Sequence, residues 1–250
     1  MASNTVYVIT GGNRGLGLGL VKALLARPAT TVVATVRSEQ AAAVLKDETT
    51  NTAKGDGSAL HAVLLDFSTA VAPEQVRQTV TAAGVDKVDV LINNAGGAQP
   101  MVPALETTAE DLRAAFETNT IAPLLVFQGL WPLLQRSAAP KLFMMSSSVG
   151  SISEMEPVPG GAYGPSRCAQ NWLTRAIHVE NKDSGLVAVA LHPGWVQTRA
   201  GQFVADEWGF SKGPPDSVES SVEGMLKVID GATKETSGTF TTSKGDTLGW

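Results

Sequence analysis

Short apolar runs alternate with longer stretches of helical periodicity along this chain. The runs that we predict to be strands are residues 6–9, 31–36, 61–65, 88–92, 141–145, 187–191 and 239–240. Because these runs are apolar throughout, rather than at every second position, they are typical of a parallel sheet that is covered on both faces.

The stretches between the runs predict helices. We expect helices over residues 15–27, 38–48, 73–83, 107–136, 162–182 and 216–230, and a polar surface loop over 49–59. Regular alternation of strand and helix with short links predicts an open, doubly wound α/β sheet, which binds ligands at the carboxyl ends of its strands. We find no repeat and no linker, so residues 1–250 are expected to form a single domain.

Composition agrees with a globular protein and excludes several classes of partner. The chain has 250 residues, 43% of them hydrophobic, and a net charge of −5, which gives no electrostatic reason to expect nucleic acid or an anionic membrane. Cys168 is the only cysteine, so an internal disulfide is excluded, and the three histidines lack metal-like spacing, so we expect no metal. With neither a long apolar run nor a secretory leader, we expect a cytoplasmic protein.

A glycine-rich turn, Thr10-Gly11-Gly12-Asn13-Arg14-Gly15-Leu16-Gly17, joins the first predicted strand to the first helix. Glycine allows positive φ angles and close approach of the backbone to a ligand. The helix that begins in the turn directs free amides and a positive dipole end at whatever lies over it. This placement favours dinucleotide binding over a plain turn.

Charged side chains follow the next strands. Arg37 stands where an acidic residue would bind the ribose hydroxyls of NAD, and Arg14 lies in the turn. Two cations suit the 2′-phosphate of NADP, although they can also be read as two surface arginines. Asp66, after the third strand, could accept a hydrogen bond from adenine or cap a helix, and the fourth strand ends in the small, amide-rich segment 93–97.

A hydroxyl, a phenol and a cation follow the fifth strand. Ser146-Ser147-Ser148 ends this strand, and Tyr163 and Arg167 lie one helical turn apart. Such groups can polarise a carbonyl and deliver a proton, because a nearby cation lowers the pKa of a phenol from about 10. The alternative is a helix start with a satisfied tyrosine and an ordinary arginine.

With these motifs and His192-Pro193-Gly194-Trp195-Val196-Gln197-Thr198, the chain resembles the short-chain dehydrogenase/reductase family over its whole length. Parts of it are most similar to the carbonyl reductase branch that includes fungal norsolorinic acid ketoreductases. The resemblance implies a Rossmann-type fold: a mostly parallel sheet of about seven strands with helices on both faces. It implies a site for NADP(H) formed by Gly11, Asn13, Arg14, Gly15, Leu16, Gly17, Arg37, Asp66, Phe67, Asn93, Ala95, Gly96, Tyr163, Arg167, Pro193, Gly194, Val196 and Thr198.

The resemblance also implies catalytic roles. Tyr163 would donate the proton, Ser147 would hold the carbonyl oxygen, and Asn119 would hold a water of a proton relay. Where the family has lysine, this chain has Arg167, which keeps the cation but is bulkier and cannot give up a proton, so a relay through this side chain is doubtful.

The segment that follows the sixth strand is expected to be a substrate lid, at about residues 196–215. Its aromatic side chains suggest a large flat or apolar substrate, although they can equally pack a pair of helices onto the domain. The expected substrate-binding residues are Ser147, Met155, Trp195, Phe203 and Trp208. The resemblance also implies a homodimer or homotetramer paired through the helices at 107–136 and 162–182.

Three hypotheses for function follow. The first is an NADPH-dependent reductase of a carbonyl in a bulky, aromatic secondary metabolite. The second is an enzyme of natural-product biosynthesis that reduces an imine or iminium, or steers a cyclisation, since hydride addition to an iminium needs no proton at the reacting atom. The third is an NADP-binding protein with weakened catalysis, which only the Arg167 departure supports.

Overall fold

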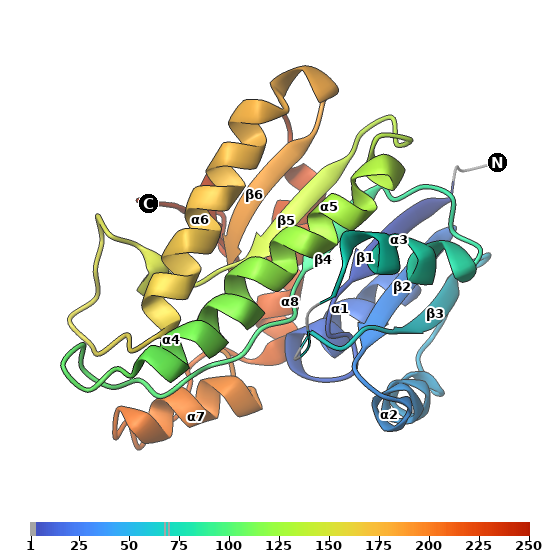
Figure 1. Ribbon diagram of the computed structural model, residues 1–250. Coiled ribbons are helices and arrows are strands. Elements are labelled where there is room, and N and C mark those ends of the chain that lie inside the picture. The colour runs from blue at the N-terminus through green and yellow to red at the C-terminus, as the bar shows by residue number, and fades with distance from the viewer. Residues whose placement is uncertain (1–3, 68, 70) are drawn as a thin grey trace.

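The computed structural model describes residues 4–67, 69 and 71–250. In this part of the chain, eight strands form one sheet in the order β3-β2-β1-β4-β5-β6-β7-β8. Figure 1 shows the order from β3 to β6. Every neighbouring pair is parallel except β7 and β8, which are antiparallel. The order reverses direction between β1 and β4, and a doubly wound sheet binds its ligand beside such a switch point.

The strands are β1 Thr5–Ile9, β2 Thr30–Val36, β3 Ala59–Leu64, β4 Val90–Asn93, β5 Lys141–Met145, β6 Val187–His192, β7 Phe240–Thr242 and β8 Thr247–Leu248. The α-helices are α1 Gly15–Leu25, α2 Glu39–Thr49, α3 Pro73–Ala82, α4 Ala109–Phe116, α5 Ala122–Leu134, α6 Tyr163–Glu180, α7 Arg199–Glu207 and α8 Val218–Gly231. Short helical turns are η1 Glu117–Ile121, η2 Ser148–Gly150 and η3 Lys182–Ser184. None of the helices in the described ranges combines the length and the apolar character that crossing a membrane requires.

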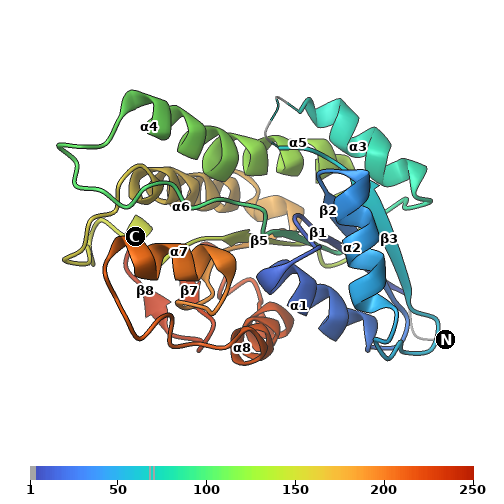
Figure 2. The same cartoon turned by 90° about the horizontal axis from the view of Figure 1, so that it is seen from below.

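Two apolar cores lie on opposite faces of the sheet. Figure 2 shows α3, α4, α5 and α6 on one side and α1, α7 and α8 on the other. Helix α2 packs in the same core as α1, through Ala41 and Leu45. Alternate residues of one strand supply both cores: Tyr7 and Ile9 face the core with α1 and α8, and Val6 and Val8 face the core with α3 and α5. Burial of both faces explains why the strands are apolar throughout, and the doubly wound fold is confirmed.

Apart from the short turns η2 and η3 and small shifts at the ends of elements, the predicted elements differ from the structure in four places. The helix expected over 107–136 is interrupted by the π-helix η1, which separates α4 from α5. Helix α7 and the two-residue strand β8 were not predicted. The polar loop is shorter than 49–59, because Thr49 ends α2 and Ala59 begins β3. Because of β8, the sheet has eight strands rather than the expected seven.

Candidate active site

The glycine turn between β1 and α1 can be built only with glycine at key positions. Gly11 and Gly15 adopt φ angles of +71° and +53°, in the left-handed region. A Cβ at Gly17 would lie 2.1 Å from the carbonyl oxygen of Gly11. The start of α1 therefore packs directly on the turn, and the backbone is open to a ligand above it.

The first turn of α1 fits an anionic group. Its N-cap is Arg14, whose side chain makes no capping hydrogen bond, so the first N–H groups of the helix are available to a ligand. Arg14 and Arg37 are exposed, and neither takes part in an ion pair within the described residues. The amides and the two cations together suit the phosphates of a dinucleotide.

Asn94, which the sequence analysis left without a role, fixes the shape of this turn. Its Nδ2 donates to the carbonyl oxygens of Thr10 at 2.9 Å and Gly11 at 3.3 Å. The backbone N–H of Ala95 donates to Thr10 Oγ1 at 2.8 Å. Asn94 thus joins the end of β4 to the glycine turn, and only its place in the amide-rich segment could have indicated this.

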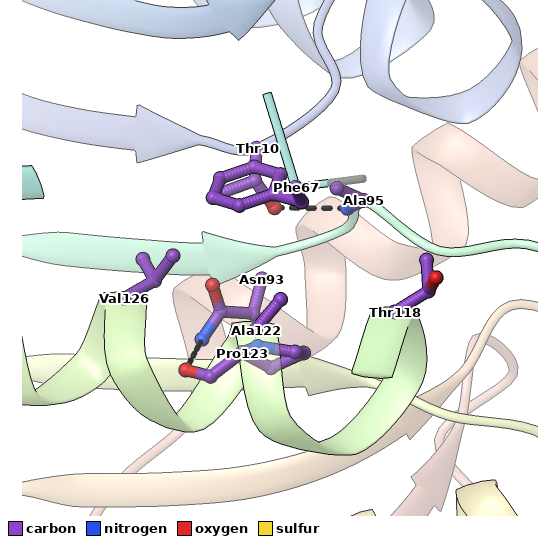
Figure 3. A pocket seen from close by; sticks show the side chains of 8 residues that line it. All are labelled: Thr10, Phe67, Asn93, Ala95, Thr118, Ala122, Pro123 and Val126. Carbon is purple, nitrogen blue, oxygen red and sulfur yellow. Dashed lines mark hydrogen bonds between the residues drawn. The ribbon is translucent and has the colours of Figure 1, made fainter. Parts of the chain in front are cut away.

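The side chain of Asn93 points away from the glycine turn and into the layer between the sheet and α5. Its Nδ2 donates to the carbonyl oxygen of Pro123 at 3.0 Å, as Figure 3 shows, and its Oδ1 is buried without a partner in the structure. A small cavity lies beside it, lined by Thr10, Phe67, Asn93, Ala95, Thr118, Ala122, Pro123 and Val126. Because Asn93 is only 1% exposed, its contact with a cofactor stays a prediction.

Asp66 follows β3, and its suggested alternative role was the cap of a helix. The next helix, α3, begins at Pro73 and has Ala72 as its N-cap, so Asp66 does not cap it. The interpretation of Asp66 as an adenine-binding residue stays a prediction.

Ser147 and Tyr163 come from elements that pack on each other. Ser147 is the N-cap of η2, and Val149 N–H donates to its Oγ at 3.3 Å. Tyr163 is the first residue of α6. A Cβ at Gly164 would lie 3.2 Å from the carbonyl oxygen of Val149, and one at Gly150 would lie 2.7 Å from Cβ of Arg167. Small residues on both elements therefore bring η2 against the first turns of α6.

Asn119 lies in the π-helix and is fully buried. Its Oδ1 accepts from the N–H of Gly97 at 3.0 Å, and its Nδ2 donates to the Gly97 carbonyl at 3.0 Å and to Ser166 Oγ at 3.1 Å. Ser166 Oγ donates in turn to the carbonyl of Tyr163 at 2.7 Å. The side chain of Asn119 thus connects the loop after β4 to the start of α6, and π-turns often mark such functional positions.

Arg167 points inward beneath the ring of Tyr163. Its Cζ lies 5.0 Å from the ring centroid, a cation–π contact. Nη1 donates to the carbonyl of Met145 at 2.8 Å and to Gln170 Oε1 at 2.7 Å. Arg167 is 5% exposed. The predicted cation therefore lies beside the phenol, and the Met145 carbonyl and Gln170 hold it there.

The loop after β6 borders the site on the side of β6 and α7. Gly194 has a φ of +93°, and a Cβ there would lie 2.5 Å from Asp216 Oδ2, which accepts from the N–H of Trp195 at 3.1 Å. Thr198 caps α7, with Gly201 N–H donating to its Oγ1 at 3.1 Å, and its methyl group would lie 3.4 Å from a Cβ on Gly15. The loop after β6 therefore reaches back to the glycine turn.

His192, which ends β6, holds the turn that carries the serines. Its Nδ1 accepts from the N–H of Ser148 at 3.3 Å. Burial lowers the pKa of His192 to about 4; Lys244 adds to this effect, and Glu156 and Asp216 oppose it. His192 is therefore neutral at pH 7, with its proton on Nε2.

We expect His192 to make the folded state less stable at acid pH. Because its folded pKa lies below its unfolded value of about 6.5, the unfolded chain takes up the proton first as pH falls. The free energy of unfolding should be highest above pH 6.5 and decrease toward pH 4, by less than about 3 kcal/mol because the residue is partly exposed to water.

Urea titrations from pH 4 to pH 7 measure this effect. In His192→Asn, the amide oxygen can still accept from Ser148. The free energy of unfolding of this variant should therefore decrease less toward pH 4 than that of the wild type, by the contribution of His192. His61→Asn, on β3, is the matched control and should keep the full decrease. An unchanged pH dependence in His192→Asn would show that the titration lies elsewhere.

Aromatic side chains gather at the segment 196–215, where the lid was predicted. Trp195 packs against Trp208 and Phe210, with ring centroids 5.6 and 5.0 Å apart. Trp208 Nε1 donates to the carbonyl of Pro159 at 3.1 Å, and Glu207 accepts from the N–H of Met101 at 3.1 Å. Part of this aromatic set therefore packs α7 against the loops before α4 and α6.

Two other predicted substrate contacts are open to solvent. Met155 is 74% exposed and Phe203 is 36% exposed. No group of three or more His, Cys, Asp or Glu side chains in the described part of the chain could hold a metal ion.

Comparison with known proteins identifies the family of this chain. Residues 5–208 match the short chain dehydrogenase family. The chain belongs to this family. The resemblance inferred from the glycine turn, the serine turn and Tyr163 is thereby confirmed.

Relatives of the short chain dehydrogenase family cover the whole chain. A short-chain dehydrogenase of Pyricularia oryzae is 37% identical, with both chains covered completely. The norsolorinic acid ketoreductase of Aspergillus parasiticus is 36% identical over 98% of this chain and 91% of its own. The NADPH-bound carbonyl reductase from chicken fatty liver superposes with a TM-score of 0.82 at 31% identity, covering 99% of this chain and 100% of its own.

Proposed function

We propose that this protein is an NADPH-dependent reductase of a carbonyl group in a bulky, aromatic metabolite. The observation that carries the proposal is the packing of the Ser147 turn against the start of α6, where Tyr163 stands with the guanidinium of Arg167 beneath its ring. The relatives described above include a ketoreductase and a carbonyl reductase, which supports carbonyl reduction as the reaction.

NADP(H) fits the residues around the glycine turn. The cradle that Gly17 leaves open and the uncapped first turn of α1 would hold the pyrophosphate. Arg14 and Arg37, exposed and free of ion pairs in the described ranges, would hold the 2′-phosphate. Pro193, Gly194, Val196 and Thr198 would lie at the nicotinamide end.

The residues of the site perform the acid–base part of the reaction. When bound, NADPH supplies the hydride. The hydroxyl of Tyr163 donates a proton to the carbonyl oxygen, which completes the alcohol. Ser147 Oγ donates a hydrogen bond to the same oxygen as negative charge develops on it. Arg167 is a fixed cation below the phenol rather than a proton relay, because a guanidinium does not give up a proton.

The aromatic side chains support a flat, bulky substrate. Met155 and Phe203 are exposed on segments that flank the site, and the segment 196–215 would act as a lid over it. On α6, Trp172 and Val179 are 68% and 50% exposed, which supports the predicted homodimer or homotetramer. A cytoplasmic location and a role in secondary metabolism stay predictions.

A panel of aromatic ketones and a matched panel of cyclic imines test the reaction, with NADPH consumption as the readout. Turnover of ketones with inert imines is expected. The reverse pattern would favour imine or iminium reduction, for which the commitment of Arg167 Nη1 to Met145 and Gln170 is no handicap. Nucleotide binding without turnover of either panel would indicate the NADP-binding protein.

Arg37→Gln should separate NADPH from NADH. Loss of one charge-assisted contact to the 2′-phosphate should raise the Kd of NADPH about tenfold to hundredfold and leave that of NADH unchanged. Fluorescence titration measures both constants. Arg136→Gln, at the opposite end of the sheet where its side chain donates to the Asp86 carbonyl, is the matched control. Equal effects of Arg37→Gln on both nucleotides would contradict a 2′-phosphate site.

A further inference from the structure

Arg167 is a buried charge without an ion-pair partner among the residues that the structure describes. The residue is 5% exposed, and no ion pair among residues 4–67, 69 and 71–250 includes it. The acceptors that the structure gives it are neutral: the Met145 carbonyl and the amide oxygen of Gln170. Its Nε is buried without a partner in the structure. Arginine side chains carry a positive charge in proteins, and the field of this charge acts on the neighbouring groups.

The surroundings of this cation are buried and closely packed. Gln170 is fully buried and Met145 is 4% exposed. A Cβ on Gly96 would lie 2.4 Å from Nη2, so the loop after β4 packs directly on the guanidinium. Water and salt screen a charge in such a place poorly, and its effect extends to neighbouring groups.

We infer that Arg167 makes the site bind the reduced nicotinamide cofactor more tightly than the oxidised one, and that Gln170 is the positioning residue that fixes its charge. The inference rests on the proposed function. The carbonyl whose oxygen Tyr163 protonates has to lie close to the nicotinamide, because its carbon accepts the hydride. The guanidinium packs on the ring of this tyrosine. The oxidised nicotinamide ring is a cation and the reduced ring is neutral, so only the oxidised form is repelled.

The chemical consequence is a higher midpoint potential of the bound cofactor. At an effective dielectric constant of about 20, two like charges within about 12 Å of each other change a binding constant by about tenfold or more. For a two-electron couple, this corresponds to about 30 mV in the midpoint potential of the bound cofactor. The shift favours release of the oxidised cofactor after hydride transfer. It also makes bound NADPH a slightly weaker hydride donor, and it leaves the overall equilibrium of the reaction unchanged.

The ratio of the Kd of NADP⁺ to the Kd of NADPH isolates the repulsion of the oxidised ring by Arg167. Both nucleotides make the same contacts through their phosphates and adenine, so these contacts cancel in the ratio. Calorimetry and NADPH fluorescence measure the two constants without turnover. Arg167→Met removes the charge, and Gln170→Glu leaves Arg167 in place but sets a carboxylate beside Nη1. In both variants the ratio should fall about tenfold from the wild-type value.

Two control variants keep a positive charge at position 167, beside the Tyr163 ring. Arg167→Lys retains the cation and should keep the ratio, and Arg37→Gln should weaken NADPH and NADP⁺ equally. An unchanged ratio in both Arg167→Met and Gln170→Glu would overturn the inference and leave the proposed function intact. Failure of the wild-type protein to bind either nucleotide would overturn the proposed function and the inference with it. Gln170→Glu is close to isosteric, so it keeps the test decisive if Arg167→Met fails to fold.

Discussion

Replacing Tyr163 with phenylalanine should lower the kcat of ketone reduction by about a thousandfold, within the range typical of a positioned general acid. The variant keeps the ring that packs on Arg167 and loses only the hydroxyl. The Kd of NADPH should therefore stay within about twofold of the wild-type value, because the loss is one of proton delivery rather than of structure.

Steady-state kinetics and nucleotide titration on the same preparations measure both quantities. Tyr7→Phe is the matched control, since Tyr7 is buried in β1, where its hydroxyl accepts from Arg27 Nη1 at 3.5 Å. The control should keep its kcat. A kcat of Tyr163→Phe within tenfold of the wild type with ketones would remove Tyr163 from the role of proton donor. Retained turnover of iminium substrates alone would agree with the second hypothesis, which needs no proton at the reacting atom.

Gly17→Ala should weaken binding of NADPH and NADH alike by about a hundredfold. The added methyl carbon would lie 2.1 Å from the Gly11 carbonyl oxygen and 2.7 Å from Asn94 Nδ2, so the first turn of α1 has to move away from the glycine turn. Overpacking of this kind costs about 1–3 kcal/mol, and the shift also misdirects the amides that would hold the pyrophosphate.

Fluorescence titration gives the affinity for each nucleotide, and thermal unfolding shows whether the fold is retained. Gly231→Ala is the matched control, because a Cβ there meets nothing within 4 Å and its φ is ordinary for any residue. If Gly17→Ala bound NADPH within threefold of the wild type, the close contact between α1 and the glycine turn would not define the nucleotide site.

Local sequence information predicts the strands and helices of this protein but not the places where they are interrupted. The alternation of strands and helices was predictable because each apolar run has to be buried on both faces, and this requirement is written in consecutive residues. The interruption of the helix at η1 was not, because Asn119 takes its partners from Gly97 and Ser166, which are distant in sequence. The capping Thr198 could have indicated α7, whereas β8 has only two residues and no periodicity to read.

The sequence by itself determined the family, the doubly wound sheet and the set of side chains at the strand ends, since residue type and spacing carry that information. Only the tertiary structure decided how these side chains are used. Asn94 rather than Asn93 binds the glycine turn, and Arg167 turns inward to Met145 and Gln170. The physical reason is that the direction of a buried polar side chain depends on which acceptors the packed neighbours leave within hydrogen-bonding reach.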